Sequence, residues 1–205
     1  SDISSSSFFI ALTALSKNSK LTIRNVNVNP SRIGILEILK IMGIKIIIKN
    51  IKSYKGEKVA DLFIRGKDVF KPINCPSKLN SAAIDEFLLI FLIAAKADGI
   101  SYFKNLSELN KKESPRLIWG SKILNKMGIK TILKKDSIKI YGNPNLKVKK
   151  NIIIKNFLKD HRVFMMSTIA ALTLGGNWRI NDKDSINSSF PIFLNILKEL
   201  GAKFN

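Results

Sequence analysis

This 205-residue chain has few of the residue types that build redox, metal or disulfide sites. It contains one cysteine, Cys75, and one histidine, His161, so no disulfide forms within the chain and no metal-ligand spacing is present. A single cysteine in a lysine-rich chain favours a reducing, cytoplasmic setting. We expect Cys75 to be packed and not reactive.

Long apolar runs and cofactor motifs are also lacking. The longest apolar run, Phe87 to Ala95, is far below the about 20 residues that a membrane-spanning helix needs, and no charged-then-apolar signal opens the sequence. There is no Walker loop, dinucleotide-binding glycine fingerprint or serine triad motif. We therefore expect a soluble protein of one domain with no membrane partner, and a mechanism without cofactor or metal.

Acidic residues are scarce relative to basic ones. The sequence has 35 Lys and Arg against 15 Asp and Glu, a formal net charge of +20, which attracts phosphate-bearing partners such as nucleic acids or small anionic metabolites. The lysines are scattered beside isoleucine and asparagine and form no basic stripe with interleaved aromatics. A general compositional bias explains this pattern, and a basic nucleic-acid-binding module is the alternative.

Three segments of the chain end alike, which indicates an internal repeat. Each is an apolar-periodic stretch that is closed by glycine and followed by a strand-like run: Leu39–Lys45, Leu124–Lys130 and Leu197–Lys203. Thirteen residues before each glycine stand Pro30, Pro115 and Ser188, preceded by Asn29, Ser114 and Asn187. Because Asn and Ser cap helix starts and proline suits the first turn, the pattern predicts three helices of matched length, each closed by a left-handed glycine.

Another helix is predicted before each of these three, at residues 4–17, 84–97 and 161–174. Strands are expected at residues 21–24, 44–49, 59–65, 101–104, 130–133, 137–141 and 178–180. The fold class is therefore α/β, with a helix-strand-helix-strand-strand unit repeated at about 1–66, 67–142 and 143–205. We expect a single lobe over 1–205 with the second helices side by side. The third unit lacks its closing strands, which must come from outside the chain.

Acids and bases gather at the predicted helix starts. The second unit has Asp85, Glu86, Lys112, Glu113 and Arg116 there, and the third has Asp160, His161 and Arg162. In one interpretation Asp85 is a helix N-cap, the remaining charged side chains are solvated, and the lone histidine is structural. The other brings several helix N-termini together with the arginines as an anion site, in which a carboxylate exchanges a proton with the substrate. Met165 and Met166 are expected to lie in the core.

Five motifs in order resemble the signature set of the 5-enolpyruvylshikimate-3-phosphate synthases. They are Asn29–Gly43, Ile84–Phe87, Lys112–Leu117, Asp160–Arg162 and Ser189–Pro191, and the resemblance runs from Asp2 to the end of the chain. It implies the C-terminal lobe of a two-lobed transferase, an inside-out α/β barrel-like assembly of three units with helix N-termini aimed at the cleft between lobes. The N-terminal lobe and a short segment that completes this lobe are then partners that lie outside the chain.

The resemblance also implies an activity and the residues that perform it. The family transfers the enolpyruvyl group of phosphoenolpyruvate to the 5-hydroxyl of shikimate 3-phosphate through a tetrahedral intermediate and releases phosphate. The implied catalytic residues are Asp85, which accepts the hydroxyl proton, and Glu113, which protonates the phosphoenolpyruvate methylene. The implied substrate-binding residues are Lys112, Arg116, His161 and Arg162.

Two positions depart from the family pattern. Pro115 stands where aspartate is usual, and because proline suits a helix start we expect the helix to survive. Ser188 stands where some members carry a lysine that contacts phosphoenolpyruvate. A related family, the UDP-N-acetylglucosamine enolpyruvyl transferases, shares the fold, but Lys112–Ser114 and Asp160–Arg162 argue against it. Alone, one lobe is expected to be inactive.

Overall fold

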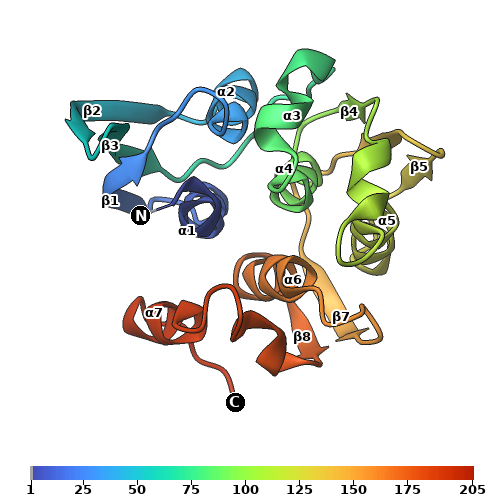
Figure 1. Ribbon diagram of the computed structural model, residues 1–205. Helices are drawn as coiled ribbons and strands as arrows, with labels where there is room; N and C mark the ends of the chain where they lie inside the picture. The colour runs from blue at the N-terminus through green and yellow to red at the C-terminus, as the bar shows by residue number, and fades with distance from the viewer. Residues whose placement is uncertain (1) are drawn as a thin grey trace.

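Three helices occupy the centre of the structure, a computed structural model that describes residues 2–205. They are α1 (Ile3–Leu15), α4 (Phe87–Ala94) and α6 (His161–Leu174), which are seen nearly end-on in Figure 1. All eight residues of α4 are buried. A helix that is apolar on every side needs protein all around it, which explains its central position.

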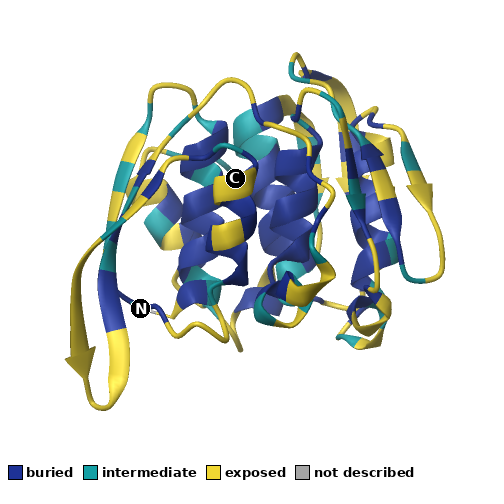
Figure 2. Cartoon of the chain, turned by 90° about the horizontal axis from the view of Figure 1, so that it is seen from above, coloured by how far each residue is buried: buried dark blue, intermediate teal, exposed yellow. Residues whose placement is uncertain are grey.

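The second helix of each unit lies outside this central group. These helices are α2 (Gly34–Ile41), α5 (Arg116–Lys126) and α7 (Phe193–Glu199). The prediction that they lie side by side is wrong, because it is the first helices that pack together. Each second helix keeps a polar face in water, for example Lys40 of α2 and Lys126 of α5, and has only one apolar face to bury. Figure 2 shows the buried helices between sheets with exposed outer positions.

The first two units each form a three-stranded antiparallel sheet. Strands β1 (Lys20–Asn27), β2 (Ile46–Tyr54) and β3 (Glu57–Arg65) lie in the order β1-β3-β2. Strands β4 (Ile100–Phe103), β5 (Thr131–Leu133) and β6 (Ile138–Tyr141) repeat it as β4-β6-β5. The predicted helix-strand-helix-strand-strand order is therefore confirmed for these two units.

The third unit differs from the prediction at its start. Strand β7 (Val148–Ile154), which was not predicted, precedes α6 and pairs in parallel with β8 (Gly175–Ile180). Its lysines and asparagine hide the strand signal, because only Val148, Ile152 and Ile154 are buried. After α7, no further strand is present within residues 2–205, as predicted. A hollow of about 420 Å³ lies among β8, α6 and α7.

The predicted glycine closures of the second helices are confirmed. Gly43, Gly128 and Gly201 have φ values of 86°, 93° and 97°, the left-handed region that favours glycine. In each case the next amide bonds back across the glycine to a carbonyl of the last helical turn: Ile44 to Leu39, Ile129 to Leu124 and Ala202 to Leu197, at 3.0, 3.0 and 2.9 Å.

The predicted starts and equal lengths of these helices are wrong, since α2, α5 and α7 have 8, 11 and 7 residues. Asn29 caps no helix; its Oδ1 accepts the Ser31 amide in a turn, and α2 begins only at Gly34. There a side chain would come within 2.7 Å of the Ala82 backbone. The α2 start therefore packs so closely on Ala82 that only glycine fits at position 34. The Asn187 side chain caps no helix either, because α7 begins at Phe193.

Short helices connect the main elements: η1 (Ser77–Leu79), α3 (Asn80–Ala83), η2 (Ser107–Lys111) and η3 (Lys183–Ile186). Cys75 is packed in the core, as predicted, and its burial raises the pKa of the thiol to about 11. Met165 and Met166 are also buried, as predicted. Within residues 2–205 no helix is both long enough and apolar enough to cross a membrane.

Candidate active site

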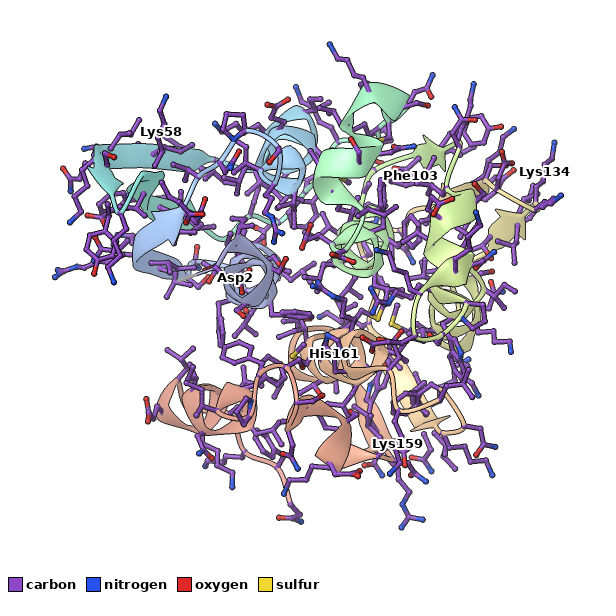
Figure 3. All side chains as sticks on the ribbon, viewed as in Figure 1. Asp2, Lys58, Phe103, Lys134, Lys159 and His161 are labelled. Atoms are coloured by element: carbon purple, nitrogen blue, oxygen red, sulfur yellow. The ribbon has the colours of Figure 1, made fainter. Side chains whose placement is uncertain are left out.

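Four helices begin at one polar cluster, which joins all three units. The hydroxyl of Ser4, in the first turn of α1, donates to Oε1 of Glu86 at the start of α4 (2.7 Å). Arg162 of α6 donates to the carbonyl oxygen of Asp85 (2.7 Å), and Ser114, just before α5, donates to Oδ2 of Asp160 (2.8 Å). In Figure 3 the labelled Asp2 and His161 mark the α1 and α6 starts. The predicted convergence of helix N-termini is therefore present.

Asp160 is fully buried and is the centre of this cluster. Its two oxygens accept four hydrogen bonds, from Nε and NH2 of Arg116 (2.8 and 3.2 Å), from the Ser114 hydroxyl and from the Arg162 amide (2.9 Å). Burial alone would raise the pKa of Asp160, but the Arg116 hydrogen bond and charge outweigh it and lower the pKa below its usual value. Asp160 is the N-cap of α6, where its side chain accepts the Arg162 amide.

Arg116 has all of its guanidinium nitrogens occupied. Besides the two bonds to Asp160, its NH1 lies 3.3 Å from Oδ1 of Asp85, and its NH2 lies 3.7 Å from Oε2 of Glu113. Its side chain is only 3% exposed, so the interpretation of Arg116 as a solvated charge is wrong. Its guanidinium holds three carboxylates in one place.

The start of α5 is built differently from the prediction. Ser114 gives its hydroxyl to Asp160 and caps no helix, and Pro115 takes the N-cap position without breaking α5. The Trp119 amide bonds to the Pro115 carbonyl (2.9 Å), so the helix survives as predicted. Oδ1 of Asn110 accepts the Leu117 amide (3.2 Å). Sequence spacing gave no sign of this cap, because Asn110 lies seven residues before its partner.

Asp85 lies between three cations at the surface of the cluster. Its Oδ1 is 3.2 Å from Nζ of Lys112 and 3.3 Å from NH1 of Arg116. Partial burial raises the pKa of Asp85, but the charges of Arg162, Lys112 and Arg116 together hold it below its usual value. The N-cap interpretation of Asp85 is wrong, because Glu86 occupies that position of α4. The Asp85 carboxylate is anionic near neutral pH and 39% exposed.

Glu113 and His161 form a second acid and base pair beside Arg116. Nδ1 of His161 lies 2.9 Å from Oε2 of Glu113, whose side chain is about half exposed. Burial lowers the pKa of His161, the Glu113 charge opposes this, and the Arg162 charge adds to the lowering. His161 is therefore mainly neutral near pH 7, beside a carboxylate that solvent can reach.

Arg162 differs from Arg116 in that part of its guanidinium is free. Only NH1 has partners within residues 2–205: the Asp85 carbonyl at 2.7 Å and Oε1 of Glu86 at 3.5 Å. Its Nε and NH2 remain as donors, and the side chain is 12% exposed. This fork suits a phosphate or carboxylate.

One group of possible metal ligands exists among the described residues, namely Glu113, Asp160 and His161. The four lone pairs of Asp160 are already used by four donors, and a carboxylate has no more to offer. A metal ion here would have to displace Arg116 or another donor. Arg116 already supplies the positive charge of this group.

A small polar hollow that sequence spacing did not indicate lies beside Asp85. Its volume is about 190 Å³, and it is lined by the α1 start, the turn before α2, α3 and the segment that leads into α4: Ser4, Ser31, Arg32, Ser81, Ala82, Ile84, Asp85 and Glu86. The hollow extends the site from the Lys112 side of Asp85 toward the first unit.

Comparison with known proteins decides the family. The family model for EPSP synthase (3-phosphoshikimate 1-carboxyvinyltransferase) matches residues 1–197. The chain belongs to the EPSP synthase family. This confirms the resemblance seen in the five motifs, and it favours neither the nucleic-acid-binding module nor the UDP-N-acetylglucosamine enolpyruvyl transferase.

Relatives in the EPSP synthase family show the same correspondence along the whole chain. The 3-phosphoshikimate 1-carboxyvinyltransferase of Ruthia magnifica is 36% identical over 205 residues, which are 100% of this chain and 46% of the relative. The enzyme of that name from Petrotoga mobilis is 35% identical over 97% of this chain and 45% of its own length. The chain thus spans about half the length of these relatives.

Solved structures agree with the family assignment. The structure of an EPSP synthase from Acinetobacter baumannii matches with a TM-score of 0.91 and 32% identity, over 97% of this chain and 45% of that one. An enolpyruvyl transferase from Streptomyces tendae matches with a TM-score of 0.71 at 14% identity, over 98% of this chain and 43% of that one, which shows a shared fold. The predicted inside-out α/β lobe is confirmed.

Proposed function

We propose that this chain is the catalytic lobe of an enzyme that transfers the enolpyruvyl group of phosphoenolpyruvate to the 5-hydroxyl of shikimate 3-phosphate and releases phosphate. The observation that carries the proposal is the placement of two solvent-accessible carboxylates, Asp85 and Glu113, among Lys112, Arg116 and Arg162 where four helices begin. This arrangement offers anion binding and proton transfer at one place.

Asp85 is proposed to accept the proton of the attacking hydroxyl. As the oxygen bonds to C2 of phosphoenolpyruvate, its proton passes to the carboxylate, which is anionic because of the cations around it. Lys112, 3.2 Å from the same carboxylate, stabilises negative charge that develops on the oxygen. Both groups therefore act on one side of the reacting carbon.

Glu113 is proposed to move a proton to and from the methylene carbon of phosphoenolpyruvate. Addition requires that this carbon gain a proton, and loss of phosphate from the tetrahedral intermediate requires that a proton leave it again. A carboxyl group can serve in both directions. His161 contacts Glu113 at 2.9 Å and orients it, and in this role it lines the site without contributing a full positive charge.

The anionic groups of phosphoenolpyruvate are proposed to bind at Arg162 and Arg116. Arg162 has two free donor nitrogens, whereas Arg116 is held by three carboxylates. We therefore assign Arg162 the larger part of the binding free energy and Arg116 the larger part of the site's architecture. Ser188, exposed after η3, has no charge to add where some family members have lysine.

A second lobe is part of the proposal. Asp85, Lys112 and Glu113 are accessible to solvent, and a two-substrate transfer needs water excluded and both substrates oriented. The match to about 45% of each relative supports such a partner. We propose repeat boundaries near 1–66, 67–142 and 143–205, and a cytoplasmic setting supported by the single buried Cys75.

Phosphate release is the direct test. The chain alone should show no turnover with phosphoenolpyruvate and shikimate 3-phosphate, whereas it should turn over when complemented with the part of the Ruthia magnifica relative that it does not match. In this complemented enzyme, Asp85→Asn and Glu113→Gln should each lower kcat by about a hundredfold or more with much smaller changes in KM. Turnover by the chain alone, or a near-normal kcat in either variant, contradicts the proposal.

A further inference from the structure

Glu86 is a nearly buried carboxylate within the site, and the proposed reaction gives it no role. Its side chain is 4% exposed and lies 3.5 Å from NH1 of Arg162. We propose that Glu86 is a positioning residue, whose Oε1 fixes the guanidinium of Arg162 so that its free nitrogens face phosphoenolpyruvate. The inference rests on the proposed function, because it deepens the role of Arg162 there.

The contacts of Arg162 show why a second acceptor matters. NH1 donates to the Asp85 carbonyl at 2.7 Å, and within residues 2–205 this bond and the Glu86 contact are the only hydrogen bonds of the guanidinium. A single hydrogen bond lets a planar group swing about the bond axis. Two acceptors on the same nitrogen restrict that motion, and neither of them occupies Nε or NH2, which stay available as a fork.

Glu86 is itself held in place from another unit. The Ser4 hydroxyl of α1 donates to the same Oε1 at 2.7 Å, across 82 residues of sequence. The Ser4, Glu86 and Arg162 side chains therefore form a continuous line from α1 through α4 to α6. This line ties the orientation of Arg162 to the packing of the three central helices.

The neighbouring carboxylates Asp85 and Glu86 have opposite environments. Asp85 is partly exposed and its pKa is lowered by the surrounding cations. Burial raises the pKa of Glu86, and the Ser4 hydrogen bond and the Arg162 charge only partly oppose this. Asp85 and Asp2 add negative charge near Glu86, and Arg32 lines the same hollow. Burying the Glu86 carboxylate therefore has a free-energy cost, which the Ser4 hydrogen bond and the Arg162 charge offset in part.

A charge effect and a positioning effect predict opposite changes in phosphoenolpyruvate affinity when the Glu86 carboxylate is removed. If only charge mattered, removal of a carboxylate near an anion site would strengthen phosphoenolpyruvate binding by removing repulsion. If positioning matters, loss of the acceptor oxygen weakens binding, whereas glutamine, which keeps an oxygen that can accept from Arg162 and Ser4, preserves it. The amide and alanine variants at position 86 thus separate the two effects.

Steady-state kinetics of the complemented enzyme is the main experiment. Glu86→Ala should raise KM for phosphoenolpyruvate about tenfold or more, the scale of a lost hydrogen bond to a charged group. Glu86→Gln should stay within about threefold of the parent, and Ser4→Ala should shift KM in the same direction as Glu86→Ala but less. In each variant kcat should change less than KM. The exposed Glu37→Ala on α2 controls for the loss of one negative charge.

A second measurement on the 205-residue chain keeps the inference testable apart from activity. In NMR spectra the Nε–H signal of Arg162 should broaden or shift in Glu86→Ala and stay close to the parent in Glu86→Gln. An unchanged or lower KM in Glu86→Ala, an unaltered Arg162 signal, or a glutamine variant as impaired as alanine overturns the positioning role. If instead the parent complemented enzyme shows no turnover, the proposed function fails, and the NMR result still decides whether Glu86 positions Arg162.

Discussion

Replacement of Arg116 by glutamine is expected to lower the free energy of unfolding by about 3 to 5 kcal/mol, the range measured when one partner of a buried ion pair is removed. Asp160 is fully buried, and Arg116 supplies two of its four hydrogen bonds, at 2.8 and 3.2 Å. Without the guanidinium, the Asp160 carboxylate keeps only the Ser114 hydroxyl and the Arg162 amide. The other two carboxylate partners of Arg116, Asp85 and Glu113, are partly exposed and add little.

Urea unfolding of the chain and its variant, followed by circular dichroism at pH 7, measures this difference. The stabilisation that Arg116 and Asp160 provide should depend on pH in a defined direction. Because the pKa of Asp160 is lowered in the folded state, its stabilisation is present above the unfolded value of about 3.9 and is lost as the pH falls through the folded value. The difference in the free energy of unfolding between the parent and Arg116→Gln should therefore become smaller at acidic pH.

A matched control and a double-mutant cycle complete the test. Lys111→Gln removes an ion pair of 2.8 Å to Glu108 that is largely exposed, and it should leave the unfolding midpoint almost unchanged. Arg116→Gln combined with Asp160→Asn should cost less than the sum of the two single changes, because both remove the same pair. A loss below about 1 kcal/mol in Arg116→Gln, the scale of a surface pair, would refute the assignment of a buried ion pair.

Two further predictions concern the cations and the histidine of the site. Arg162→Gln should weaken phosphoenolpyruvate binding to the complemented enzyme by about 1.5 to 3 kcal/mol in calorimetry, whereas Lys134→Gln with Lys135→Gln should have far less effect. If the double lysine variant weakens phosphoenolpyruvate binding as much as Arg162→Gln, or if mixed-sequence DNA binds the chain tightly at physiological salt, general basicity explains the anion binding better than a specific site. By NMR titration the pKa of His161 should lie below 6.5, and Glu113→Gln should lower it further, because the Glu113 charge opposes the lowering; an increase would contradict the pairing.

Local features of the helices were predictable from the sequence. Gly43, Gly128 and Gly201 close their helices through a left-handed backbone and the amide that follows, so only neighbouring residues are involved. Likewise, Asp160 caps α6 by accepting the amide of Arg162, two residues further along. The starts of α2 and α7 were not predictable in this way, because no side-chain cap fixes them. Strand β7 was missed since its exposed lysines break the apolar pattern.

The motifs predicted which residues form the site, but not the hydrogen bonds that connect them. The motifs named Asp85, Glu113 and Arg162, but not the Ser4 contact to Glu86 or the Asn110 cap. These contacts join residues up to 82 positions apart. No spacing rule connects such residues, because the Ser4 contact depends on how separate units pack and the Asn110 cap depends on how the segment before α5 folds back.

The sequence by itself determined the repeat, the α/β class, the family and the residue types at the helix starts, because each depends on local periodicity, capping or motif order. Only the tertiary structure decided that α1, α4 and α6 form the centre, that Arg116 forms a buried ion pair with Asp160, and that Arg162 keeps two free donors. The physical reason is burial. The helix α4, which is buried at every residue, must be enclosed, and packing α1 and α6 against it brings their polar N-termini together, where buried charges must pair with one another.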